Sequence, residues 1–274
     1  MLHKRPLRAA VATLGALVTS CLLAAPAEAQ DPARAPHEAP HEAPHEAPHE
    51  APHEAPHGMG WGRETFVLTE VLEYDPAGAE RPLLFDVIAW TGGASRRLWF
   101  KADGSMATVE RASHGEYQLL YGWMLSPYWD VQVGARADLR AASSNRAARA
   151  GAVLGLQGLA PGWFELEPSL FVTSRGNLTF DLTASYDLFL TQRLVLQPRL
   201  ESSVSLKDDA EFGVGRGLSS TSFGLRTRYE IRREFGPYVG VVWERGYGRS
   251  AELARLAGES AGETMIVAGL RLWR

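Results

Sequence analysis

The chain has 274 residues, one cysteine and a formal net charge of −4 at pH 7. A single cysteine excludes both an intrachain disulfide framework and a cysteine-rich zinc site. A slightly acidic chain also lacks the strongly basic balance that is typical of nucleic-acid binding, so no nucleic-acid partner is predicted.

The first 29 residues have the pattern of a secretory signal peptide. Three basic residues precede an apolar stretch over residues 9–25, and Ala27-Glu28-Ala29 fits a small-x-small cleavage site. The sequence VTSC, which ends at Cys21, leaves a lipoprotein signal as the alternative. We expect ordinary cleavage after residue 29, which would remove the cysteine from the mature chain.

A four-residue repeat of the form APHE dominates residues 30–60. Proline at every fourth position prevents a helix, and the near absence of large apolar side chains prevents a core, so we predict a disordered tail. Imidazole and carboxylate groups are ligands for Cu(II), Zn(II) and Ni(II). The tail is therefore a candidate metal-binding segment, with an inert spacer as the alternative. Its histidines are His37, His41, His45, His49, His53 and His57.

From residue 61 to residue 274 apolar residues recur at every second position, which is typical of strands. In the segment 177–189, for example, Leu182 falls on the apolar face and Asp181 on the polar face. The runs extend over about 9–14 residues, a length that suits strands crossing a bilayer at a tilt. We predict an all-β fold, a transmembrane antiparallel β-barrel of about 12 strands whose apolar face meets lipid. The expected strands are 66–74, 83–90, 97–106, 114–125, 128–140, 149–158, 163–174, 177–190, 192–206, 218–232, 235–245 and 263–274.

The connections between these strands mostly alternate between short and long. Tight turns are expected at 126–127, 160–162 and 234–236, and long connections at 207–217 and 246–262. Short turns of bacterial barrels face the periplasm. We therefore expect the protein in the cell outer membrane, with the N-terminal tail in the periplasm. Aromatic residues near the expected strand ends are predicted to anchor the barrel at the membrane interfaces; they are Tyr128, Trp129, Trp163, Phe164, Tyr238 and Trp243.

Several long segments resemble the copper resistance protein B family. They are FDVIAWTGGASRRLWFKADG (85–104), LLYGWMLSPYWDVQVGAR (119–136), GLAPGWFELEPSLFVTSRGNLTFDLTASYDLFLTQRLVLQPRLE (158–201), LRTRYEIRREFGPYVGVVWER (225–245) and VAGLRLW (267–273). The resemblance covers nearly all of residues 59–274. It implies an outer-membrane barrel that contributes to copper tolerance by binding copper ions in the periplasm, by exporting them, or both. Copper is then a cargo; outer-membrane lipid is a further partner, and a periplasmic copper-handling protein is a candidate partner.

Charged residues are dense on the expected inward face of the barrel. Such residues either brace a narrow barrel with salt bridges or provide a path for cations. His114 is the one histidine that follows the tail, and it lies near Glu116 and two expected strands from Asp86. Imidazole with carboxylates favours Cu(II), whereas a thioether favours Cu(I), so both oxidation states stay open. The predicted metal ligands are the six tail histidines, Met59, His114, Asp86 and Glu116.

Two other functions fit parts of the pattern. A passive channel with a spacer tail would need no metal chemistry. A lipid hydrolase of the outer membrane would need a serine across the barrel wall to pair with His114. Ser113, its neighbour in sequence, points to the opposite face, and the sequence has no GxSxG motif. We therefore predict that the protein is not an enzyme.

Overall fold

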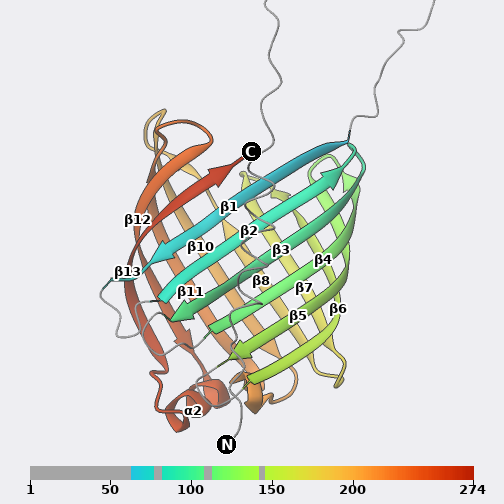
Figure 1. Ribbon diagram of the computed structural model, residues 1–274, viewed down its shortest axis with the longest axis vertical. Coiled ribbons are helices and arrows are strands. Elements are labelled where there is room, and N and C mark those ends of the chain that lie inside the picture. Colours follow the sequence, from blue (N-terminus) through green and yellow to red (C-terminus); the bar gives the residue numbers. More distant parts are fainter. Residues whose placement is uncertain (1–62, 77–81, 108–112, 142–145) are drawn as a thin grey trace, which may run out of the picture. The chain divides into compact units, whose positions relative to one another are not determined.

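The computed structural model of the protein describes residues 63–76, 82–107, 113–141 and 146–274, which form a closed antiparallel β-barrel (Figure 1). The predicted signal peptide and tail lie outside the described residues. Apart from the short ninth strand, each strand pairs with the next along the chain, and the last pairs with the first. The strands are β1 (Glu64–Tyr74), β2 (Pro82–Gly92), β3 (Arg96–Ala107), β4 (Ser113–Ser126), β5 (Trp129–Ala141), β6 (Arg146–Ala160), β7 (Phe164–Thr173), β8 (Leu178–Ser185), β9 (Leu188–Phe189), β10 (Leu194–Ser205), β11 (Gly217–Tyr229), β12 (Phe235–Gly246) and β13 (Gly262–Trp273).

The short strand β9 continues β8, because both pair with successive parts of β10, so the wall has twelve strand positions. The predicted twelve-stranded barrel is confirmed, but the uninterrupted strand expected at 177–190 is wrong. The ladder breaks where Tyr186 faces Pro198 of β10, whose carbonyl accepts a hydrogen bond from the Tyr186 amide at 3.2 Å. Proline has no N–H to return, so the two-way exchange of hydrogen bonds stops at this pair.

The barrel closes between β1 and β13. Leu68 lies opposite Trp273 and Tyr74 opposite Ala268, with a shift of register between these pairs. Beyond β13, Val67 and Arg274 exchange two backbone hydrogen bonds of 2.9 Å. The first and last described segments of the chain therefore close the sheet and leave no free edge, as a bilayer requires.

The two faces of the wall carry opposite chemistry, as the alternation predicts. In β8, Phe180 on the outward face is 40% exposed, whereas its neighbour Thr179 on the inward face is 4% exposed. The same contrast recurs around the barrel. Large apolar side chains that remain exposed on the described strands include Leu98, Phe100, Leu119, Tyr121, Val133, Leu154, Phe223, Leu225, Val239, Val241 and Ile266. This apolar exterior matches the predicted lipid face.

The two ends of the barrel differ in their connections. Tight turns at 93–95, 127–128, 161–163, 190–193 and 230–234 lie at one end, where β1 begins and β13 ends. The two longest connections, 206–216 and 247–261, lie at the other end, together with the short β7–β8 turn at 174–177. The connection from β12 to β13 contains helix α2 (Gly248–Leu256), which the sequence did not predict (Figure 1). The connection from β10 to β11 contains the 3-10 helix η1 (Ala210–Phe212). None of the helices in the described segments has the length and apolar character needed to cross a membrane.

A small apolar core lies inside the barrel, on the wall formed by β2 to β7. It consists of Ile88, Trp99, Leu120, Val153 and Phe171, all less than 9% exposed. Alternation does not reveal this core, because the same residue types also form the lipid face. Tyr238 is a further difference. Tyr128, Trp163, Phe164 and Trp243 are exposed as expected for interface anchors, but Tyr238 is buried at 6% exposure and faces inward beside Gly269.

Candidate functional site

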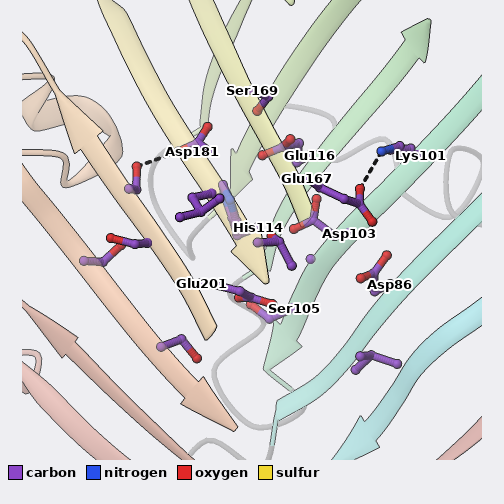
Figure 2. A pocket seen from close by; sticks show the side chains of 18 of the residues that line it. Asp86, Lys101, Asp103, Ser105, His114, Glu116, Glu167, Ser169, Asp181 and Glu201 are labelled. Carbon is purple, nitrogen blue, oxygen red and sulfur yellow. Dashed lines mark hydrogen bonds and ion pairs between the residues drawn. The ribbon is translucent and has the colours of Figure 1, made fainter. Parts of the chain in front are cut away.

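The candidate site is the lumen of the barrel, which contains a cavity of about 630 Å³. Figure 2 shows its polar wall, with side chains from β2, β3, β4, β7, β8 and β10 directed toward the same space. The cavity exists because inward positions of facing strands carry charged and hydroxyl side chains in place of large apolar ones. It is therefore a polar compartment, enclosed by a wall that is apolar on the outside.

Four carboxylates occupy one continuous row of the wall. Asp86 lies opposite Asp103, Asp103 opposite Glu116, and Glu116 opposite Asp138 on four successive strands. Like charges in directly opposite positions of a sheet repel each other. A row of four such charges therefore requires cations nearby, either from the chain or from solution.

Arg136 of β5 supplies part of that compensation. Its guanidinium pairs with Glu116, with Asp138 at 2.7 Å and with Asp181 of β8 at 2.9 Å. The same group lies 4.4 Å from the ring centre of Phe171. One arginine thus connects three carboxylates to the apolar core, and the contact with Asp181 joins strands that are not neighbours.

Other ion pairs cross the lumen. Arg199 of β10 contacts Asp86 of β2 at 2.8 Å and Glu70 of β1 at 3.4 Å, and it also pairs with Glu201. Lys101 of β3 donates to Glu167 of β7 at 2.6 Å, a contact drawn in Figure 2. The expected salt-bridge bracing is therefore present.

Three of the carboxylates that line the cavity, namely Asp103, Glu244 and Glu263, form no salt bridge with the described residues. Asp103 lies between Asp86 and Glu116, and Glu244 lies directly opposite Glu263 on β12 and β13. The excess of carboxylates gives the lumen a negative potential, which attracts cations and repels anions.

The predicted metal ligands that the structure describes are His114, Asp86 and Glu116, and all three line the cavity (Figure 2). Both carboxylates are engaged by arginines, as described above. Within the described part of the chain, no group of three or more His, Cys, Asp or Glu side chains is arranged to hold a metal ion. The other predicted ligands, the six tail histidines and Met59, lie outside the described residues. The metal-ligand assignment stays a prediction.

Asp103 is a member of the site that the prediction of ligands missed. Its place on the inward face follows from alternation, but its position between two other carboxylates depends on the register of three strands. Sequence spacing alone does not fix that register, because the number of residues that each connecting segment takes up is not known from the sequence.

His114 and Ser113 occupy the positions expected from alternation. His114 lines the cavity and lies opposite Ser105, whereas Ser113 is on the other face of β4 opposite Met106. The arrangement therefore does not direct the two neighbouring side chains toward one reacting atom.

A closed antiparallel barrel with an apolar exterior and a charged interior defines the class of transmembrane β-barrels. The comparison with protein families then identifies the particular group. The model of the family described as copper resistance protein B precursor (CopB) matches residues 63–274, and the chain belongs to this family.

Two relatives carry the same name. Copper resistance protein B of Escherichia coli is 41% identical over 207 residues, which cover 76% of this chain and 68% of the relative. The copper resistance protein B homolog of Pseudomonas syringae pv. tomato (strain ATCC BAA-871 / DC3000) is 39% identical over 209 residues, which cover 76% and 69%. Among solved structures, a bacterial polysaccharide outer membrane secretin matches 77% of this chain and 96% of its own, with 9% identity. Its TM-score of 0.32 is too low to carry an argument.

Proposed function

We propose that the protein is an outer-membrane barrel that binds copper ions in the periplasm and contributes to their sequestration or export. The observation that carries this proposal is membership of the copper resistance protein B family over the whole barrel, residues 63–274. The acid-rich lumen supports it, because a negative interior favours metal cations. The proposed role is non-enzymatic, and copper is a cargo.

The proposed orientation places the short-turn end of the barrel in the periplasm. Its support is the contrast between the tight turns at that end and the longer connections 206–216 and 247–261 at the other. An epitope inserted at residue 250 should then bind antibody on intact cells, and one at residue 45 should bind only after the outer membrane is permeabilised. The reverse labelling pattern would refute this orientation.

The proposed copper-binding segment is the repeat at 35–58. Imidazole binds a metal only when it is neutral, and its reference pKa is about 6.5. Binding should therefore be strong above that value and should fall as the pH decreases through it. A peptide of residues 35–58 titrated with Cu(II) at about pH 7.5 and about pH 5 measures this difference. Absence of binding at both pH values would leave the tract as a spacer.

The decisive experiment is genetic. A deletion strain should grow less well in copper and should show an altered periplasmic copper content. The full chain should restore both properties, and a chain without residues 35–58 should restore them only in part if the tail holds the ions. Full restoration by the tail-less chain would move copper handling to the barrel. Normal copper tolerance in the deletion strain would favour the passive channel and refute the proposal.

A further inference from the structure

The connection between β10 and β11, residues 206–216, folds back on itself; we call it the luminal loop. Asp209 and Val214 exchange two backbone hydrogen bonds, of 2.7 and 3.0 Å, around η1. Gly213 between them has a φ of 72°, in the left-handed region that glycine adopts without strain. The sequence therefore builds a compact loop with a defined tip at this end of the barrel.

The tip of the luminal loop forms part of the cavity. Phe212 and Val214 line the same 630 Å³ space as Asp103 and Glu116. Phe212 is only 9% exposed, although it belongs to a connection between strands. The luminal loop therefore lies over the long-connection end of the cavity.

One buried arginine holds the tip. The Arg149 guanidinium of β6 donates to Asp138 of β5 at 2.6 Å and to Asp209 of the luminal loop at 3.0 Å. Its central carbon lies 4.3 Å from the ring centre of Phe212. Because the Arg149 side chain is 6% exposed, these contacts are poorly screened by water.

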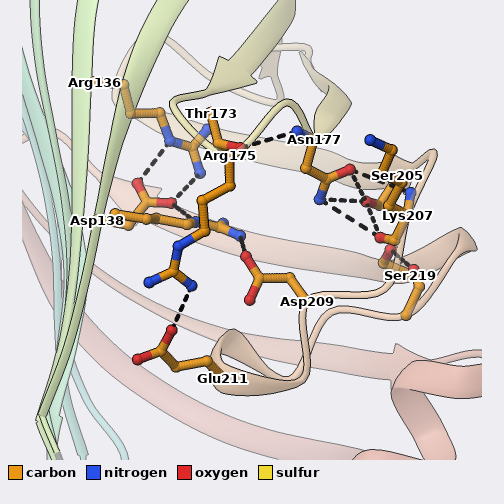
Figure 3. Close-up of polar contacts among 12 residues, drawn as sticks. Arg136, Asp138, Thr173, Arg175, Asn177, Ser205, Lys207, Asp209, Glu211 and Ser219 are labelled. Atoms are coloured by element: carbon orange, nitrogen blue, oxygen red, sulfur yellow. Dashed lines mark hydrogen bonds and ion pairs between the residues drawn. The ribbon is translucent and has the colours of Figure 1, made fainter.

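The remaining contacts of the luminal loop lie at its two ends. At the end that leads into β11, the Gly215 amide donates to Ser250 Oγ of α2 at 2.7 Å. Figure 3 shows Asn177 of the β7–β8 turn bonded to Ser205 and Lys207 at the base of the loop. The pair of Arg175 and Glu211 is 2.7 Å long, but its side chains are 64% and 37% exposed, so it contributes little. Both ends of the luminal loop are therefore fixed, one to Asn177 and the other to Ser250, whereas the tip between them depends on Arg149.

We propose that the luminal loop is a gate, closed in this structure, whose latch is the contact of Arg149 with Asp209 and Phe212. Release of the latch moves the tip, residues 209–214, away from the cavity while the two ends of the loop stay attached through Asn177 and Ser250. Arg149 keeps its bond to Asp138 in both states, so opening leaves no buried guanidinium without a partner. The inference concerns passage through the barrel and does not depend on copper as the cargo.

Two variants open the gate without removing a brace of the wall. Asp209→Asn removes the charge that binds Arg149, and Phe212→Ala removes the ring that covers it. Asp209→Asn should raise the conductance of the full-chain protein in planar lipid bilayers by about tenfold, because a hydrogen bond to a charged group can shift an equilibrium by that factor. Phe212→Ala should raise it in the same direction, because it removes the ring contact with Arg149. Glu211→Gln is the matched control in the same loop, and its conductance should equal that of the unaltered protein.

Trypsin provides an independent measurement of the loop itself. Lys207 and Arg216 flank the tip, and cleavage at either residue should be faster in Asp209→Asn and Phe212→Ala than in Glu211→Gln. Heat-modifiable migration in gels shows whether each barrel is folded. Folded variants whose conductance and cleavage rate equal those of the control would overturn the gate. Loss of the folded barrel in both variants would also overturn it, because the luminal loop would then belong to the fixed core.

Discussion

The inward and outward faces of the wall are built from the same strands, yet their side chains have different tasks. Phe171 on the inward face is fully buried beneath the Arg136 guanidinium, whereas Phe180 on the outward face is 40% exposed. The outward side chains need only be apolar, because lipid makes no specific contact with them. The inward side chains need particular partners. On the outward face, any apolar substitution should therefore be tolerated. On the inward face, a substitution should be tolerated only if it preserves the contacts with the particular partners of the side chain.

The largest effect is expected at Asp138, which is 0% exposed and accepts hydrogen bonds from Arg136 and Arg149. Asp138→Ala leaves both buried guanidinium groups short of a partner and should reduce the free energy of unfolding by about 5 kcal/mol. Denaturant titration of the barrel in lipid vesicles measures the loss. Glu201→Ala is the control, because the Glu201 side chain is 46% exposed and pairs with one arginine only, which keeps Asp86 and Glu70. Equal losses for both variants would show that the inward pairs are interchangeable.

A matched pair of phenylalanines tests the packing on the two faces. Phe171→Ala opens a void in the luminal core and should cost about 4 kcal/mol. Phe180→Ala removes the same side chain from the lipid face, where acyl chains can fill the space, and should cost far less. The same vesicle titration compares them. If Phe180→Ala were the more damaging change, the assignment of the two faces would be wrong.

The smallest of the three effects concerns charge on the lipid face. Leu182→Arg places a charge in the hydrocarbon and should cost about 2–4 kcal/mol near the bilayer midplane. Asp181→Asn, one residue away, stays in the lumen; its oxygen can accept from Arg136, and its NH2 group can donate to the Ser203 hydroxyl. Urea sensitivity of assembled barrels in outer-membrane fractions distinguishes the two variants. Comparable sensitivity would contradict the inward position of Asp181.

The alternation of residue types predicted the barrel and most of its facing, because a strand exposes successive side chains to opposite sides. Tyr238 shows where a second criterion misled. Its place near a strand end suggested an interface anchor, yet it shares the inward parity of Glu244, and that parity determines its position. The break in the strand at Tyr186 is caused by Pro198 of the neighbouring strand. The proline is visible in the sequence, but its effect on Tyr186 depends on which residue the fold places opposite it.

The contacts across the lumen could not be predicted from a single sequence. Arg199 and Asp86 are 113 positions apart, and Arg226 and Glu73 are 153 positions apart. Such partners are determined by the curvature and register of the closed wall. The luminal core and the contacts of Arg149 with the luminal loop could not be predicted for the same reason, because each brings together segments that are separated by long stretches of chain.

The seam between β1 and β13 has a consequence for the order of folding. Neighbouring hairpins bring together residues that are close in sequence, whereas the paired Val67 and Arg274 come from opposite ends of the barrel sequence. Joining distant segments requires the largest loss of chain entropy, so this pairing should form last. Until then both edges expose unpaired backbone groups that the bilayer cannot satisfy. The slow step of assembly is therefore closure of this seam. A chain truncated before β13 cannot close, so it should remain an open sheet and be degraded faster than the full chain.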